Sequence, residues 1–327
     1  MRATTGEEME EDIRYVESTV AYLDILGFSD AISRSATSPE LVRRLYWAMR
    51  SEQERQYRQH GVAAVKESKA REIAFTAFSD SLLVSYPDAT EKAIALVCGR
   101  ASAAQVNLAR NGLFFRGAMS TGPFLSEEGD GWRIAFGPGF ITAYELEKMA
   151  VWPRLLLHPD LLSHIRDTKR FENEHRVYFV SEADSGLVYL DYLTTSAVRR
   201  VRRSLTGESE MKDPLVKLFE AHSKALREQT ASFRDSAESE DARLHVLTKY
   251  RLLAAYHNRT VDAICGWSAD SGRDQSRYSY GPVKLGTLSE SQVKTRQRRL
   301  EQLVWASRSR RQFLRCLRGL KIDLASL

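Results

Sequence analysis

The order of apolar and amphipathic segments in the first half of the chain constrains its fold more than any other sequence feature. An apolar run at 19–26 is followed by two helical stretches, and then by two short apolar runs at 73–78 and 81–86. Only Ser79 and Asp80 separate those two runs, which predicts a tight β-hairpin. A hairpin that follows a strand and a pair of helices is typical of α+β domains.

The same alternation continues beyond the hairpin. A helix is predicted over 89–111 and a strand over 113–119, followed by a glycine- and acid-rich loop at 122–131. The other predicted segments are helices after Ser29, over 39–59 and over 140–149, and strands at 132–136, 154–158, 177–180 and 187–193. This order predicts a ferredoxin-like β-α-β-β-α-β core, whose central sheet is antiparallel and carries helices on one face.

Composition divides the chain into three parts. Residues 1–17 carry an acidic cluster and little apolar content, so we expect a flexible lead-in. Residues 18–200 hold the predicted α+β domain, and residues 201–327 are expected to form a helical C-terminal domain. Helical periodicity there covers 214–265 and 287–320, with breaks at 228–241 and 266–286.

The overall composition is that of a soluble globular protein. Of the 327 residues, 43% are hydrophobic and 28% are charged, and no apolar run approaches the ~18 residues of a membrane span. The N-terminal sequence lacks the basic start and apolar stretch of a signal peptide, so we expect a cytoplasmic protein. The three cysteines are far apart and the seven histidines are scattered, so any metal ion should be held by carboxylates.

The net charge of +5 is concentrated in one segment. Residues 294–321 contain ten basic residues and one acidic residue, and the remainder of the chain carries 38 basic and 42 acidic residues. Apolar side chains recur within the segment, which favours a helix that packs one face and solvates the other. A helical nucleic-acid binder that uses this segment is the less favoured hypothesis, because helical charge runs are usually exposed faces.

The first cluster of candidate functional residues is the sequence YLDILGFSD at 22–30. An apolar strand is predicted to end at Asp24, and Gly27 permits a tight turn into a helix. The first amides of that helix come from around Phe28 and Ser29. A carboxylate beside a helix N-terminus can hold a cation, while the amides can hold phosphate oxygens.

The second cluster is FSDS at 78–81, with Asp80 at the tip of the hairpin. In the predicted core this hairpin pairs beside the first strand, which brings Asp80 close to Asp24. Two carboxylates on adjacent strands can bind two divalent ions that bridge nucleotide phosphates. Each aspartate taken alone is more simply explained as a turn or capping residue.

Four motifs in this chain resemble those of class III nucleotidyl cyclases, in the same order. LDILGFSD resembles their DIxGF motif, and AFSDS occupies the place of their second metal-binding aspartate. FRGAMSTG at 115–122 and FGPGFITAYELE at 136–147 resemble the two motifs that follow. The chain is most similar to the pyrimidine cyclases of Pycsar antiphage systems, which also carry a KYxxLxxYHN element, here KYRLLAAYHN at 249–258.

This resemblance implies a uridylate cyclase that converts UTP to 3′,5′-cyclic UMP and pyrophosphate. In that reading the cyclic nucleotide is a second messenger of antiphage defence that acts on a downstream effector, and the active form is a homodimer. Asp24, Asp80 and the backbone carbonyl of Ile25 would hold two Mn²⁺ or Mg²⁺ ions, and amides near Gly27, Phe28 and Ser29 would bind the triphosphate. A cytidylate cyclase, or a catalytically silent nucleotide-binding module, is the alternative.

The chain departs from the purine cyclases at the residues that read the base and stabilise the transition state. Thr76 stands where they carry a base-reading lysine, and Ile134 replaces a second polar base reader. Ile141 and Glu145 replace their asparagine and arginine. Because both metal-binding aspartates are present, we favour a cyclase with a different base and a different cation. Arg116 is the candidate cation; alternatively it is a strand arginine paired to an acid.

Overall fold

A computed structural model describes most of the chain. The described residues are 13–59, 73–78, 80–129, 132–182, 185–205, 214–234, 239–264 and 319–324. Residues 1–12 of the expected lead-in and most of the basic segment at 294–321 lie outside them. No helix among the described residues combines the length and apolarity needed to cross a bilayer.

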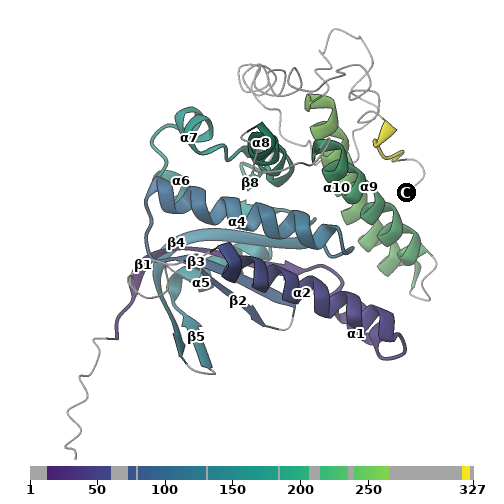
Figure 1. The fold of residues 1–327 in the computed structure, drawn as a ribbon, viewed down its shortest axis with the longest axis horizontal. Helices are drawn as coiled ribbons and strands as arrows, with labels where there is room; N and C mark the ends of the chain where they lie inside the picture. Colours follow the sequence, from purple (N-terminus) through teal and green to yellow (C-terminus); the bar gives the residue numbers. More distant parts are fainter. Residues whose placement is uncertain are drawn as a thin grey trace, which may run out of the picture.

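Within the described residues eight strands form one sheet, in which β1 lies between β3 and β4 (Figure 1). The path runs β2-β3-β1-β4-β6-β8-β7, β5 pairs with β4, and of the strand pairs that the structure describes only β4–β6 is parallel. The strands are β1 (Val16–Ile25), β2 (Ala74–Phe78), β3 (Ser81–Tyr86), β4 (Phe115–Gly129), β5 (Trp132–Phe136), β6 (Leu155–Leu157), β7 (Phe179–Ser181) and β8 (Val188–Leu190). The predicted α+β class and its mostly antiparallel sheet are confirmed.

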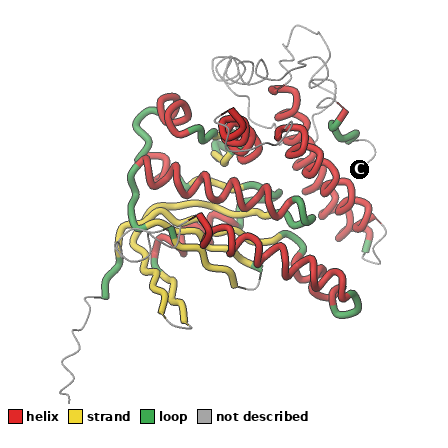
Figure 2. The backbone as a smooth tube through the Cα atoms, in the orientation of Figure 1, coloured by secondary structure: helices red, strands yellow, loops and turns green. Residues whose placement is uncertain are grey.

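Helices cover both faces of the sheet, which differs from the expected one-sided arrangement (Figure 2). Ala21 and Leu23 of β1 point into the main core under α4, whereas Val20 and Tyr22 point to the opposite face and pack with Ala143 of α5. The helices are α1 (Phe28–Ser35), α2 (Pro39–Gln59), α4 (Glu91–Ala109), α5 (Pro138–Glu147), α6 (Pro159–Ser163), α7 (Thr168–His175), α8 (Tyr192–Leu205), α9 (Pro214–Arg234) and α10 (Glu240–Ile264). Because both faces are buried, the four consecutive residues at 20–23 of β1 are all apolar.

The described helices of the C-terminal part share the main core with the sheet. Helix α8 crosses the domain boundary expected at residue 200, and α9 and α10 pack beside it. Residues 319–324 lie against α10, where the Asn258 side chain donates to the Ile322 carbonyl and accepts from its amide, both at 2.8 Å. The helical part is therefore fixed to the sheet through buried contacts.

Three sequence predictions were wrong in detail. Residues 122–129 of the loop expected at 122–131 are the end of β4, and 130–131 lie outside the described residues; beyond Phe124 this strand leaves β1 and pairs with β5, so its polar side chains need no burial. The strand expected through residue 193 ends earlier, because the Asp191 carboxylate accepts from the Thr194 amide and caps α8. Helix α9 continues into the expected break at 228–241, where buried Phe233 extends its apolar face.

Gly117 of β4 allows the close approach of β1 beside the candidate site. A Cβ there would meet the Tyr22 carbonyl oxygen and lie 3.0 Å from Leu23 Cα. We expect Gly117→Ala to lower the free energy of unfolding in urea by about 2 kcal/mol, because the added atom forces the two strands apart. Gly319→Ala is the control, since a Cβ there meets nothing within 4 Å. Equal urea midpoints for the two variants would contradict this account of the β1–β4 pairing.

Candidate active site

The site begins at the turn that joins β1 to α1. Gly27 adopts a left-handed conformation (φ +73°) that a residue with a Cβ adopts only at a cost of about 1–2 kcal/mol. The Gly27 carbonyl accepts from the Ala31 amide at 3.0 Å, and the Leu26 amide donates to the Phe114 carbonyl at 2.8 Å. The predicted tight turn, with α1 beginning at Phe28, is therefore confirmed.

The hairpin brings Asp80 to the end of β1, as the sequence predicts. Strand β3 pairs with β1 in a register that sets Ser81 opposite Asp24. The Ile25 amide donates to the Asp80 carbonyl at 2.9 Å, which ties the hairpin to the strand end. Asp24 and Asp80 therefore lie close together where β1 ends and β3 begins.

Thr76 lies on the same face of the sheet as Asp24. Residues paired across antiparallel strands share a face, as do residues two apart along one strand. Tyr22 is two residues before Asp24 and pairs with Leu83, which pairs in turn with Thr76 of β2. Thr76, the proposed base-reading residue, therefore lies two strands from β1 and is level with Tyr22, two residues before Asp24.

Arg116 is paired to two acids. It faces Asp24 across the β1–β4 pair, and its Nε lies 3.2 Å from Asp24 Oδ2 and 2.6 Å from Glu147 Oε1. The Glu147 side chain is only 5% exposed, against 18% for Asp24 and 31% for Arg116. Of the two readings of Arg116, the contacts are those of a strand arginine paired to acids.

Glu147 was missed by sequence reasoning. It is the last residue of α5, and the signal that could have found it is a lone acid on the buried face of a largely apolar helix. Burial raises the pKa of Glu147, and the charge of Asp24 adds to this, whereas Arg116 opposes it. Burial also raises the pKa of Asp24, which Arg116 lowers and the charge of Asp80 raises. The charged forms of Asp24 and Glu147 are therefore disfavoured by burial, and a bound cation would stabilise them.

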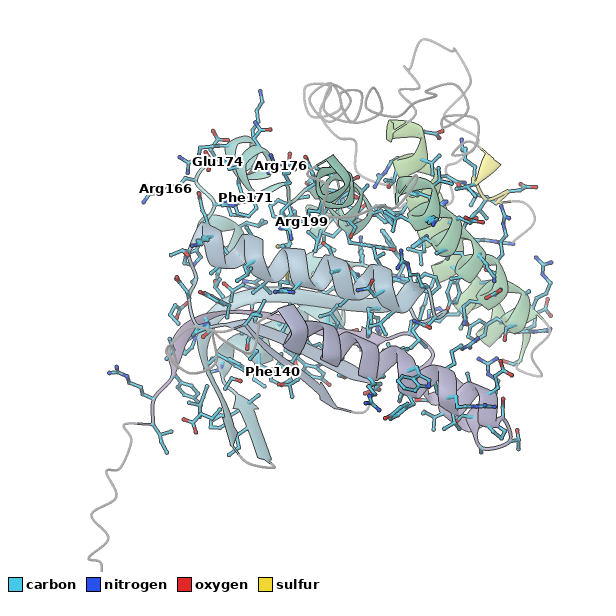
Figure 3. All side chains as sticks on the ribbon, viewed as in Figure 1. Phe140, Arg166, Phe171, Glu174, Arg176 and Arg199 are labelled. Carbon is cyan, nitrogen blue, oxygen red and sulfur yellow. The ribbon has the colours of Figure 1, made fainter. Side chains whose placement is uncertain are left out.

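A short hydrogen-bond chain positions Asp80. Ser81 Oγ donates to Asp80 Oδ1 at 3.2 Å, and Tyr22 Oη lies 2.9 Å from Ser81 Oγ. The Tyr22 ring is itself held edge-on by Phe140 and Tyr144 of α5, both with centroids at 5.6 Å. Phe140 lies on the side of the sheet away from α4 (Figure 3). Helix α5 therefore supports both carboxylates, through Tyr22 on one side and through the Glu147 contact with Arg116 on the other.

The donor set suits a hard divalent cation. Asp24 and Asp80 supply carboxylate oxygens, and Ile25, which follows Asp24 in the chain, supplies a backbone carbonyl oxygen. Oxygen ligands of this kind hold Mg²⁺ or Mn²⁺ when substrate phosphates complete the coordination. No group of three or more His, Cys, Asp or Glu side chains that could hold a metal ion occurs among the described residues. The two aspartates therefore fit an ion that is shared with a phosphate ligand.

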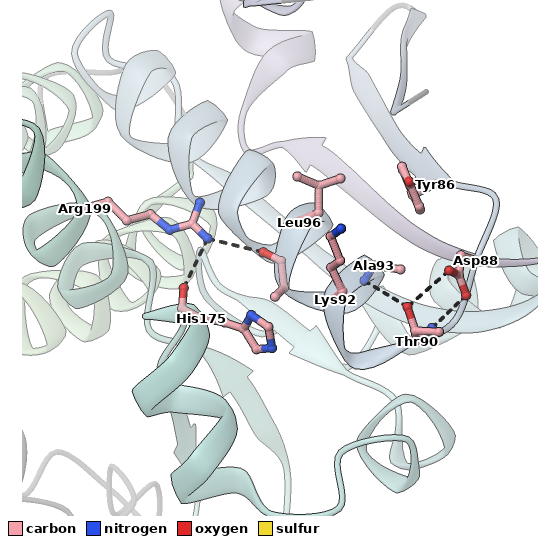
Figure 4. A pocket seen from close by; sticks show the side chains of 9 residues that line it. Tyr86, Asp88, Thr90, Lys92, Ala93, Leu96, His175 and Arg199 are labelled. Carbon is pink, nitrogen blue, oxygen red and sulfur yellow. Dashed lines mark hydrogen bonds between the residues drawn. The ribbon is translucent and has the colours of Figure 1, made fainter. Parts of the chain in front are cut away.

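The hollow seen in Figure 4 is a different place on the molecule. It measures about 310 Å³ and lies beside the start of α4, where Arg199 Nη2 donates to the Ala95 and His175 carbonyls at 3.4 and 3.5 Å (Figure 4). Its Tyr86 pairs with Thr19, at the opposite end of β1 from Asp24. None of the predicted site residues lines this hollow.

Comparison with solved structures finds nucleotide cyclases. The adenylyl cyclase CyaB from P. aeruginosa is 16% identical, with a TM-score of 0.38 over 54% of this chain and 93% of that chain. The guanylate cyclase domain of RhGC from Catenaria anguillulae, in complex with GTP, is 13% identical, with a TM-score of 0.36 over 54% of this chain and 97% of that chain. No family model and no curated protein matches the chain. At this identity and TM-score the likeness does not define a reaction or a substrate.

A divalent ion should stabilise the folded protein through the two aspartates. We expect Mn²⁺ to raise the melting temperature of the wild type, because a ligand at 100 times its Kd adds about 2.7 kcal/mol to the free energy of unfolding. Asp24→Asn and Asp80→Asn should each lose most of this shift. Asp160→Asn, on a side chain that is 79% exposed in α6, should keep it. A full shift in either site variant would remove that aspartate from the ion site.

The pH dependence follows from the raised carboxyl pKa values. Because the pKa of Asp24 lies above its ordinary 3.8, protons should compete with Mn²⁺ at a higher pH than at an ordinary aspartate. The Mn²⁺ shift should therefore shrink as the pH falls toward that pKa. Without Mn²⁺, Asp24 and Glu147 should stabilise the folded state as the pH falls, since it binds their protons more tightly than the unfolded state. Melting curves in which Asn and Gln variants at these positions keep the wild-type pH trend would contradict this.

Proposed function

We propose that this protein is a nucleotidyl cyclase, which converts a nucleoside triphosphate to a 3′,5′-cyclic nucleotide and pyrophosphate. The observation that carries the proposal is the meeting of Asp24 and Asp80 at one strand end, beside the left-handed Gly27 turn that opens α1. Carboxylates there can share a cation with phosphates, while backbone amides at the start of a helix favour phosphate oxygens. The motif order at 22–30, 78–81, 115–122 and 136–147 supports the same assignment.

The reaction is an intramolecular displacement at the α-phosphorus. The bond from the ribose 3′-oxygen to the α-phosphorus forms, the bond from that phosphorus to the pyrophosphate oxygen breaks, and the 3′-hydroxyl proton leaves to solvent. Two Mn²⁺ or Mg²⁺ ions would supply charge neutralisation and a lowered 3′-hydroxyl pKa. Asp24, Asp80 and the Ile25 carbonyl hold the ions in this proposal, and amides near Gly27, Phe28 and Ser29 orient the triphosphate.

Arg116 is the residue that we propose to respond to ion binding. Its Nε shares Asp24 with any incoming cation, and Glu147 is its second partner. A divalent ion on Asp24 would leave Arg116 with Glu147, which keeps a positive charge next to the phosphate that reacts. Arg116 would then stabilise the charge of the transition state in place of the missing arginine.

We propose a pyrimidine substrate, with UTP preferred to CTP. Thr76 is half-buried on the sheet face next to the aspartates, where it offers one hydroxyl rather than a charged group. Ile134 of β5 offers no polar atom. A buried purine edge left unpaired costs about 1–3 kcal/mol for each group, which disfavours ATP and GTP. A role for the cyclic nucleotide in antiphage defence, through a downstream effector, rests on the family resemblance and on KYRLLAAYHN at 249–258.

The active form in this proposal is a homodimer. Exposed apolar side chains gather on β5 and on α5, the helix that ends at Glu147 beside the site: Ile134 is 45% exposed, Phe136 47%, Ile141 54% and Tyr144 38%. A patch of this kind next to a site is typical of an interface between two copies.

A nucleotide-binding module without turnover is the second candidate. The observation that favours it is the ion pair between Arg116 and Asp24, which competes with a metal ion for the carboxylate. Ile141 and Glu145, in place of an asparagine and an arginine, point the same way. Such a module would bind nucleoside triphosphate and release no pyrophosphate.

Turnover of the four nucleoside triphosphates with Mn²⁺ separates the two candidates. We expect a cyclic product from UTP, less from CTP and little from ATP or GTP, identified by chromatography and mass spectrometry. Asp24→Asn and Asp80→Asn should each lower kcat at least about a hundredfold, because each removes a charged ligand of the ions. Asp160→Asn should leave kcat unchanged. Binding without any cyclic product selects the silent module, and equal turnover of ATP and UTP would overturn the pyrimidine assignment alone.

Oligomeric state tests the proposed dimer. Ile141→Asp places a charge in the exposed patch, so the variant should elute as a folded monomer and lose turnover. Leu244→Asp is the control, because Leu244 of α10 is 56% exposed and lies on a different element. A wild-type monomer that stays fully active on dilution would contradict the dimer.

A further inference from the structure

The helical C-terminal part reaches the candidate site directly. A Cβ on Gly27 would lie 3.5 Å from Phe233 Cζ of α9, and Arg34 Nη1 of α1 donates to Ser232 Oγ at 2.6 Å. The end of α9 is thus in contact with the turn and helix that open the proposed phosphate site. Figure 1 shows α9 and α10 side by side at this end of the molecule.

Tyr250 fixes the register of α10 against the same region. Its ring is fully buried, with centroids 5.8 Å from Phe114 and 5.7 Å from Phe233. Phe114 precedes β4 and accepts the hydrogen bond from Leu26, and Arg116 follows it two residues later. The residue next to Tyr250 on α10 is therefore held near the Arg116 end of the site.

That residue is Lys249, the first residue of KYRLLAAYHN. It is half-buried, and burial together with the positive charge of Arg116 lowers its pKa. Among the described residues no carboxylate forms an ion pair with Lys249, whereas Arg116 has two acidic partners. A cation held beside another cation without an acid of its own costs free energy, and an anion bound between them would offset that cost.

We propose that Lys249 is a second cation of the nucleotide site, which contacts the β- and γ-phosphates of the bound nucleoside triphosphate. This inference rests on the proposed function, and it makes the helical part a component of the active site. Lys249 keeps its proton in the reaction and neutralises charge on the departing pyrophosphate, while the 3′-oxygen forms its bond to the α-phosphorus.

Substitution of Lys249 tests the contact with two independent measurements. We expect Lys249→Gln to lower kcat/KM for UTP and to weaken binding of inorganic tripolyphosphate, each by about tenfold or more, because a charge-assisted contact is lost. Lys249→Arg should keep most of the kcat/KM for UTP and most of the affinity for tripolyphosphate. Lys224→Gln, on an α9 lysine that is 74% exposed, is the matched control and should change neither. The Lys249→Gln protein should melt no lower than the wild type, since the substitution relieves repulsion from Arg116; a purely structural lysine would lower the melting temperature.

The outcomes separate this inference from the proposed function. Unchanged kcat/KM and unchanged tripolyphosphate affinity in Lys249→Gln overturn the Lys249 contact and leave the cyclase standing. A wild-type protein that binds tripolyphosphate but forms no cyclic product from any nucleoside triphosphate overturns the cyclase. In that case an unchanged affinity in Lys249→Gln overturns the contact as well, and a weakened affinity supports it.

Discussion

The pairing of β1 with β3 on one side and β4 on the other places Asp24, Asp80 and Arg116 of the candidate site. Asp24 lies between Ser81 and Arg116 in this register, because Ala21 and Leu23 must enter the main core while Val20 and Tyr22 pack under α5. A slip of one residue would exchange the two faces and bury the Asp24 carboxylate in the main core. The packing of these two faces of β1 therefore fixes where the carboxylate emerges.

Electrostatics then define what the site can accept. Three acids and two cations lie close together, and the pKa values of Asp24, Glu147 and Lys249 are all shifted toward their neutral forms, with burial the largest cause for each. A site in which the charged forms of these three groups are disfavoured is suited to a ligand that brings charge of both signs. A divalent ion with a triphosphate is such a ligand, since the ion meets the carboxylates and the phosphates meet the cations.

The sequence was sufficient to predict the parts of this arrangement that depend on local chemistry. The meeting of Asp24 and Asp80 follows from a two-residue hairpin beside an apolar strand, and both features are visible in the chain. The loop expected at 122–131 was wrong, because polar composition does not distinguish a loop from a strand ribbon that leaves the sheet. Glu147 and Lys249 could not be placed, since their approach to Arg116 depends on how α5 and α10 pack, which periodicity alone does not specify.

A crystal structure with Mn²⁺ and 3′-deoxy-UTP, which lacks the attacking hydroxyl, tests the site most directly. Data collected at the manganese absorption edge should show anomalous peaks beside the carboxylates of Asp24 and Asp80, with the triphosphate next to the Gly27 turn. Arg116 should then contact Glu147 and no longer Asp24. Manganese or nucleotide bound elsewhere, with the ion pair between Arg116 and Asp24 intact, would contradict the account of this edge of the sheet as the reaction centre.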